Sequence, residues 1–367
     1  MSRDRSEALH ARARAFVDAF ERGAAMPEPF DRLAVDLARF QARFVPGYAR
    51  LCAHRGLDPA SFERAADAPA VPTDAFKLTD VFAFPATDAR ATFRTSGTTL
   101  GSRGTHRMRD VATYDRAALA SGRAMLAHDV PLPAPVLVIG PSEVEASDSS
   151  LAHMDALFVN AWAPEGVSVE ETYFVRGSEL EVGGLRARVE RLPASSPAIV
   201  LTTSFALVHL LDALGGARLP LPPGSRVMLT GGYKGRSREV EATQLRWAVA
   251  ETFAVAERCI VGEYGMTELS SQFWEATVRE RDARRGVYVE PPWARVVALH
   301  PETLVPVEPG QVGIARIEDL ANVDSAFAIL TQDRVRRVPG GFELLGRAPG
   351  APPRGCSIAL DEMLGGS

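Results

Sequence analysis

From about residue 90 onward, short apolar runs alternate with amphipathic helical patterns, and this alternation restricts the fold more than any other feature of the chain. The runs are short and mostly apolar, as in strands that are buried on both faces. Strands separated by helices predict an α/β layered fold. We expect strands at 136–139, 198–202, 226–229, 259–261, 313–317 and 327–330, and helices at 111–127, 204–214 and 238–253.

Composition excludes several classes of protein. The formal charge of −5 over 367 residues lacks the excess of positive charge that is typical of nucleic-acid-binding proteins. No apolar run approaches the roughly 18 residues that a membrane helix needs. The three cysteines lack CxxC spacing, which argues against a disulfide framework and a zinc site. Residues 6–55 carry helical spacing without the apolar core of a secretory signal, so we expect a cytoplasmic protein with a helical N-terminal region.

The basic residues are almost all arginines. Of 41 lysines and arginines only two are lysines, Lys77 and Lys234. The chain uses arginine at positions where a cation only has to face water. The two remaining lysines are therefore expected at positions that need a compact ammonium on a flexible stem. Survival at solvated surface positions is the plainer alternative.

A loop rich in small hydroxylated residues follows Arg94. Thr95, Ser96, Gly97, Thr98 and Thr99 would pack poorly in a core, whereas their amides and hydroxyls suit the oxygens of an oligophosphate. We expect the basic residues that follow, among them His106, to add positive charge to this loop. A solvated Ser/Thr turn is the alternative.

Two further loops follow predicted strands. Gly231 and Gly232 come after the strand at 226–229, with Lys234 on the same loop, at the strand end where α/β sheets bind ligands. The strand at 259–261 leads to a loop with an aromatic ring, a hydroxyl and a carboxylate, which suit a base, a phosphate and Mg²⁺. These are Tyr264, Thr267 and Glu268.

A fourth motif is a predicted hairpin near the C-terminal end. The strand at 327–330 leads to Asp333, and Gly346 and Arg347 follow after a turn at residues 339–341. A carboxylate that accepts both ribose hydroxyls, with an arginine nearby, suits a nucleoside. A surface ion pair, worth under roughly 1 kcal/mol, is the alternative.

Together these motifs resemble the adenylate-forming superfamily of acyl-CoA ligases, luciferases and adenylation domains. TSGTT, YGMTE and Asp333 with Gly346-Arg347 match its phosphate, aromatic and ribose motifs. More narrowly, VPTDAFKL, SDSSLAHM, TGGYKGRSREV, EYGMTELSSQ, PPWARV, DLANVDS and RGCS look like the LuxE-type acyl-protein synthetases, which are long-chain fatty acid ligases. The matches run from about residue 71 to 357 and include both lysines.

The resemblance implies an α/β fold with mixed sheets, packed helices and a short, truncated C-terminal lobe. It divides the chain into a helical region at 1–90 that is integrated into the large domain, a nucleotide- and acid-binding domain at 91–333, and a lobe at 334–367. It implies ATP and Mg²⁺ as cofactors and attack of a carboxylic acid on ATP to give acyl-AMP. The nucleotide would contact Thr95, Ser96, Gly97, Thr98, Thr99, Gly231, Gly232, Tyr264, Gly265, Met266, Thr267, Glu268 (which would also bind the metal), Asp333 and Arg347.

The acyl acceptor implied by the resemblance is a protein thiol, and Cys356 is our candidate. It lies on a Pro/Gly-flanked tail that we expect to be exposed and mobile, whereas Cys52 and Cys259 lie in apolar patterns. Only 20 residues follow Arg347, so we expect no full C-terminal domain with its adenylation lysine. Lys234 is our first candidate for the missing cation, and Lys77 is the second.

His153, in SDSSLAHM, is a candidate for contact with the acid substrate, although a lone histidine is more often a satisfied core residue. A long-chain fatty acid is the expected substrate, and an acyl reductase or a carrier protein is the expected partner. Two alternatives stay open: a ligase that delivers an aromatic or secondary-metabolite acid to a carrier-protein thiol, and a non-catalytic nucleotide-binding relative.

Overall fold

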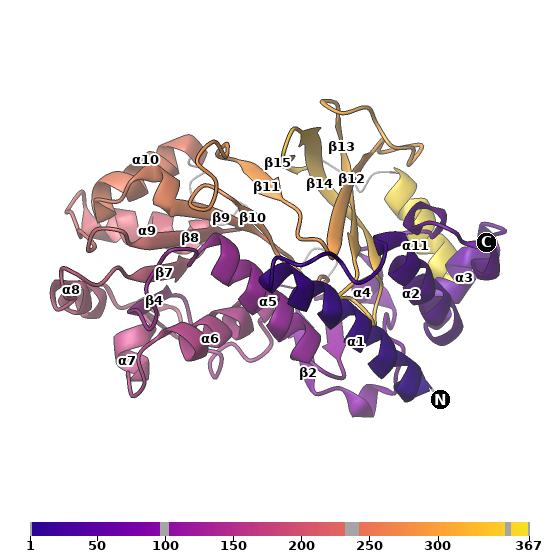
Figure 1. The fold of residues 1–367 in the computed structure, drawn as a ribbon, viewed down its shortest axis with the longest axis horizontal. Coiled ribbons are helices and arrows are strands. Elements are labelled where there is room, and N and C mark those ends of the chain that lie inside the picture. The colour runs from indigo at the N-terminus through magenta and orange to yellow at the C-terminus, as the bar shows by residue number, and fades with distance from the viewer. Residues whose placement is uncertain (1, 96–102, 232–241, 349–353, 366–367) are drawn as a thin grey trace. The chain divides into compact units, whose positions relative to one another are not determined.

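The computed structural model describes residues 2–95, 103–231, 242–348 and 354–365, without the side chains of 354 and 355 (Figure 1). The chain forms two compact units. Unit 1 holds residues 1–120, 266–272 and 289–367, and unit 2 holds residues 121–265 and 273–288. These units follow contacts between residues, so the domain boundaries at 90 and 333 stay a prediction.

Unit 1 combines N-terminal helices with a mostly antiparallel sheet. The sheet has the order β12-β13-β14-β15, and β1 pairs in parallel with β14. A separate hairpin is formed by β2 and β3. The elements are α1 (Ser2–Glu21), α2 (Phe30–Phe44), α3 (Pro46–His54), β1 (Val71–Pro72), α4 (Ala75–Leu78), β2 (Ala91–Arg94), β3 (Thr105–Met108), β12 (Ala294–Leu299), β13 (Val312–Asp319), β14 (Ala328–Val338), β15 (Gly341–Arg347) and α11 (Arg354–Leu364).

Unit 2 contains the parallel strands that the alternating pattern predicts. Strands β4, β7, β8 and β9 are parallel neighbours in that order, and β10 is antiparallel to β9. The elements are β4 (Val136–Ile139), α6 (Ser150–Trp162), α7 (Val169–Thr172), β5 (Val175–Arg176), β6 (Glu179–Leu180), α8 (Val182–Glu190), β7 (Ile199–Thr202), α9 (Ser204–Leu214), β8 (Arg226–Thr230), α10 (Ala242–Phe253), β9 (Ile260–Tyr264) and β10 (Phe273–Glu275), with α5 (Ala112–Met125) and β11 (Val287–Val289) at the unit boundaries.

The central strands of unit 2 are buried on both faces. Leu137 and Ile139 of β4 join an apolar cluster with side chains of α8, α9 and α10. The alternate residues Val136 and Val138 are also buried. This double burial explains why the strands are continuously apolar.

The fold class is confirmed as α/β with mixed sheets and packed helices. Every strand and helix named from the sequence is present. Their ends lie within three residues of those expected, except that β14 continues to Val338 and that residues 238–241 lie outside the described part. In the parts of the chain that the structure describes, none of the helices has the length and apolar character required to cross a membrane.

Candidate active site

The predicted phosphate loop starts and ends on the β2–β3 hairpin of unit 1. The Thr95 amide donates to the Gly104 carbonyl at 2.9 Å, and the Gly104 amide donates to the Thr95 hydroxyl at 2.8 Å. The Arg103 guanidinium donates to the Thr95 carbonyl at 2.6 Å. Thr95 therefore closes the base of the loop. The other predicted residues of the loop, Ser96, Gly97, Thr98 and Thr99, lie outside the described residues.

Lys77 lies beside this base. A β-carbon built on Gly104 would lie 3.6 Å from Cγ of Lys77, so the lysine stem packs against the end of the loop. Its ammonium lies 2.6 Å from Oδ1 of Asp74. Gly232 and Lys234 lie outside the described residues, so the role of Lys234 as the cation stays a prediction.

The expectation that His106 adds positive charge to the loop is wrong. The ring is buried on β3, and desolvation lowers its pKa to about 4, so it is neutral near pH 7. Its Nδ1 lies 2.7 Å from the carbonyl oxygen of Thr267, which requires the proton to be on Nδ1. His106 therefore fixes the backbone of a predicted nucleotide-binding residue instead of supplying charge.

The segment with Thr267 and Glu268 is held by a buried polar network that sequence reasoning missed. Asn322 donates to the Glu268 carbonyl at 2.8 Å and accepts from the Ser270 hydroxyl at 2.7 Å. Asp319 accepts from the Ser270 amide at 2.9 Å. Burial raises the pKa of Asp319 to about 6. Asp319 and Asn322 belong to the motif DLANVDS, so the sequence contained a signal for them. Their role is to hold the backbone at Glu268 and Ser270.

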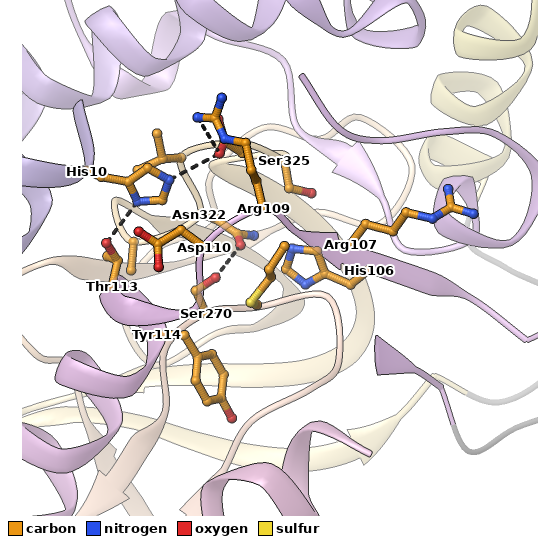
Figure 2. Close-up of a pocket in the computed structure, with 14 residues that line it drawn as sticks. His10, His106, Arg107, Arg109, Asp110, Thr113, Tyr114, Ser270, Asn322 and Ser325 are labelled. Carbon is orange, nitrogen blue, oxygen red and sulfur yellow. Dashed lines mark hydrogen bonds and ion pairs between the residues drawn. The ribbon is translucent and has the colours of Figure 1, made fainter. Parts of the chain in front are cut away.

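A small cavity lies beside this network (Figure 2). Its volume of about 20 Å³ has room for one water molecule. His10 lies 2.8 Å from the Thr113 hydroxyl and 3.2 Å from an Asp324 oxygen, and Arg109 lies 3.1 Å from the same carboxylate. All four side chains are largely buried, so they fasten α1 to the segment that carries Asn322.

The predicted ribose-binding pair lies on one hairpin. Asp333 of β14 and Arg347 of β15 are partners across the antiparallel ladder, and Arg347 Nε lies 3.4 Å from Asp333 Oδ1. The hairpin predicted around residues 339–341 is therefore confirmed. The ladder changes register between Asp333 and Val335, and such bulges redirect side chains near functional sites. Their binding of ribose stays a prediction.

In unit 2, Gly231 and Tyr264 lie at the carboxyl ends of the adjacent strands β8 and β9. Gly231 has a φ of +76°, which favours glycine. Tyr264 is buried, with its ring centroid 6.0 Å from that of Phe273 and 6.1 Å from that of Tyr288. Gly265 ends this stretch of unit 2, while Met266 begins the stretch of unit 1 that carries Thr267.

Glu263 of β9 and Asp155 of α6 are two buried carboxyl groups of unit 2 whose charges interact. The Thr230 hydroxyl donates to Glu263, and burial raises the pKa of Glu263 to about 7. Burial also raises the pKa of Asp155 on α6 well above its usual value, with the Glu263 charge as a second cause. His153, two residues before Asp155, lies 2.6 Å from Glu143. The contact of His153 with an acid substrate stays a prediction.

The expected exposure of Cys356 is wrong. The residue lies in α11, is 3% exposed, and its Sγ donates to the Thr331 carbonyl at 3.7 Å. Burial, with a smaller effect of Asp74, raises the pKa of its thiol to about 12. Cys52 and Cys259 are buried as well, so exposure does not distinguish the three. The described residues of the C-terminal segment form α11, which packs against α3, where Arg50 donates to the Met363 carbonyl at 2.7 Å (Figure 1).

Comparison with known proteins decides the family. The family model described as "Acyl-protein synthetase, LuxE" matches residues 30–365. The chain belongs to the LuxE acyl-protein synthetase family. It is therefore an AMP-forming acid–thiol ligase, as the sequence predicts.

Individual relatives of this LuxE-family protein are distant. The long-chain-fatty-acid–luciferin-component ligase of Vibrio harveyi is 22% identical over 334 residues, which cover 86% of this chain and 82% of the relative. Two structures of 2-hydroxyisobutyryl-CoA ligase have the same fold. The open form with 2-HIB-AMP and CoA gives a TM-score of 0.60 at 14% identity, over 86% of this chain and 74% of that chain. The form in the thioesterification state gives 0.61 at 15% identity, over 86% and 68%.

Proposed function

We propose that this LuxE-family ligase activates a long-chain fatty acid with ATP and transfers the acyl group to a protein thiol. The observation that carries the proposal is the family match over residues 30–365, because it spans the proposed site from Lys77 to Cys356. The fatty acid is supported by the name of the Vibrio harveyi relative, which aligns over most of its length.

Two bond exchanges make up the reaction. First, a carboxylate oxygen of the acid bonds to the α-phosphorus of ATP, and the bond from that phosphorus to the bridging oxygen breaks, which releases pyrophosphate. Then the sulfur bonds to the acyl carbon, the carbon–oxygen bond to AMP breaks, and AMP keeps the bonding electrons. The thiol proton passes to solvent. Positioning and neutralisation of charge supply the acceleration.

The proposed residues suit these steps chemically. The hydroxyls and amides of 95–99 suit phosphate oxygens, with Lys77 or Lys234 as the cation. Asp333 and Arg347 suit the ribose, and Thr267 suits the α-phosphate. The remaining assignments are Gly231, Gly232 and Tyr264 at the adenine, Gly265 and Met266 at the nucleotide, and His153 at the acid.

Glu268 fits Mg²⁺. Nucleotide-bound Mg²⁺ takes one or two carboxylates beside phosphate oxygens, and the Glu268 backbone is fixed by Asn322 at 2.8 Å. When bound, Mg²⁺ would neutralise charge on the phosphates. The contribution of the chain is to hold Thr267 and Glu268 in place through His106 and Asn322.

Cys356 stays our proposed first acceptor, with an acyl reductase or a carrier protein as the subsequent one. Its support is position: its sulfur contacts the carbonyl of Thr331, two residues from Asp333. A buried thiol with a raised pKa is a poor nucleophile, so transfer requires that Cys356 leave the described environment.

The test measures pyrophosphate release with Mg-ATP and a panel of saturated fatty acids, aromatic acids and short hydroxy acids. We expect release with hexadecanoate and other long-chain acids. Release with aromatic acids alone would replace the proposed substrate, and no release with any acid would overturn the proposal. Acylation is then located by mass spectrometry. Hydroxylamine-labile acyl groups should be lost in Cys356→Ser and retained in the matched variant Cys52→Ser, whereas their persistence in Cys356→Ser would refute the acceptor.

A further inference from the structure

Asp74 is a buried carboxylate between two functional segments of unit 1. It follows β1 and precedes α4, and it is 6% exposed. Its Oδ1 lies 2.6 Å from the Lys77 ammonium, and its Oδ2 accepts from the side-chain amide of Gln332 at 2.8 Å. Both oxygens are therefore engaged in directional contacts, which fix the carboxylate and its two partners relative to one another.

On the Lys77 side, the contacts lead to the predicted phosphate loop. The Lys77 stem packs at Gly104, and Gly104 is hydrogen-bonded twice to Thr95. The Lys77 side chain is only 15% exposed, so it has little freedom to leave this place. Asp74 therefore determines where the ammonium lies at the base of the loop.

On the Gln332 side, the contacts lead to the predicted ribose and acceptor residues. Gln332 lies between Thr331, whose carbonyl accepts from Cys356, and Asp333. The strand β1 before Asp74 is paired to the same stretch of β14, where the Thr73 amide donates to the Leu330 carbonyl at 3.1 Å. The charge of Asp74 also reaches the thiol, because it contributes to the raised pKa of Cys356.

We propose that Asp74 is a positioning residue that holds Lys77 at the base of the phosphate loop and, through Gln332, holds the strand segment beside Asp333 and Cys356. The proposal rests on the proposed function with Lys77, the second of the two candidate lysines, as the cation for adenylation and Cys356 as the acyl acceptor. One carboxylate would thus link the residues of both half-reactions. In the sequence, the only indication of this role for Asp74 is its position three residues before Lys77.

The test compares Asp74→Asn with Asp74→Glu and with the control Asp80→Asn, an exposed carboxylate on the same segment. With hexadecanoate and Mg-ATP, Asp74→Asn should lower kcat for pyrophosphate release by roughly a hundredfold, because small misplacements of catalytic groups have effects of this order, with a smaller change in KM. Asp74→Glu should recover part of the loss, and Asp80→Asn should match the wild type.

Alkylation provides a second readout that needs no turnover. In Asp74→Asn the rate of iodoacetamide reaction at Cys356 should rise roughly tenfold, because the β14 segment whose Thr331 carbonyl accepts from the Cys356 thiol loses the contact between Gln332 and the Asp74 carboxylate, which makes release of the thiol easier. Cys52 and Cys259 should be unchanged, as judged by peptide mass spectrometry. A rise at all three cysteines would indicate general loosening and overturn the proposal, as would wild-type kcat with unchanged Cys356 alkylation.

A second variant covers the case in which Asp74→Asn does not fold. Gln332→Met breaks the Asp74–Gln332 bond and leaves the Asp74–Lys77 pair, so it should lower kcat by roughly tenfold. Wild-type kcat in Gln332→Met would overturn the link to β14. If the wild-type protein released no pyrophosphate with any acid, the proposed function would fail, while the alkylation comparison would still decide whether Asp74 acts on Cys356 through β14.

Discussion

Glu263 is the group whose replacement has the most definite expected effect on stability. It is 4% exposed at the end of β9, and the Thr230 hydroxyl donates to it. Its pKa rises from an ordinary value of 4.5 to about 7 because burial disfavours the charged form. Glutamine keeps the size of the side chain and an oxygen that accepts from Thr230, but it does not titrate.

The sign of the pH dependence follows from the direction of this shift. Between pH 4.5 and about 7 the folded state holds a proton that the unfolded chain has lost, so stability falls as the pH rises through this window. At 1.36 kcal/mol per unit, the loss reaches about 3 kcal/mol and is complete above the folded pKa. In Glu263→Gln this loss is absent. Asp155 acts in the same direction, because burial and, as a second cause, the Glu263 charge raise its pKa above the usual value.

Equilibrium urea unfolding at about pH 5 and about pH 8, followed by tryptophan fluorescence, measures the effect. The free energy of unfolding of Glu263→Gln minus that of the wild type should be larger by about 2–3 kcal/mol at the higher pH than at the lower, because only the wild type loses stability in this window. The exposed residue Glu165 provides the control, and Glu165→Gln should follow the wild-type curve. Parallel curves for wild type and Glu263→Gln would refute the assignment of a raised pKa to this carboxyl.

Four further substitutions test the packing of individual residues. Asn322→Leu removes the donor to the Glu268 and Ala326 carbonyls, so urea unfolding should show a loss of roughly 3 kcal/mol, while the exposed Asn160→Leu should show little change. A β-carbon at Gly313 would lie 2.6 Å from the Leu299 carbonyl oxygen, so Gly313→Ala should lower stability by roughly 1–3 kcal/mol. Gly183→Ala in α8, with open space around it, should raise the melting temperature slightly. Met363→Ala should weaken the docking of α11 by about 2–5 kcal/mol and speed alkylation of Cys356, while the exposed Ile358→Ala should not.

The fold followed from periodicity because each element satisfies a strong local rule. The run at 136–139 is apolar at every position since both faces of β4 are covered, and no such run could be exposed. The β14–β15 hairpin was equally accessible, because Pro339 and Gly340 mark its turn between the two strands. For β4 and for the β14–β15 hairpin, the residues close by in sequence are sufficient to predict the element.

The buried residues that hold the backbone of the candidate site, His106 and Asn322, could not be predicted from neighbouring residues in this way. The partners of His106 and Asn322 lie far away in sequence, at Thr267 and Glu268. A histidine between Thr105 and Arg107 resembles a member of a basic loop, and only the pairing of β2 with β3 turns its side chain inward. Such roles depend on which strand face meets which loop, and that is a property of the tertiary structure.

The burial of Cys356 was within reach of the sequence. Cys356, Ala359 and Met363 recur at spacings of three and four and are all buried, whereas Ile358 and Leu364 are exposed. This stripe predicts a docked helix, but the proline and glycine residues before it suggested a free tail. A nucleophile in the docking stripe of a helix can react only when that part of the helix separates from its neighbours. The rate of acyl transfer to Cys356 should therefore fall as the docking of α11 on α3 becomes more stable. Tighter docking should slow this second half-reaction without affecting the first, the formation of acyl-AMP.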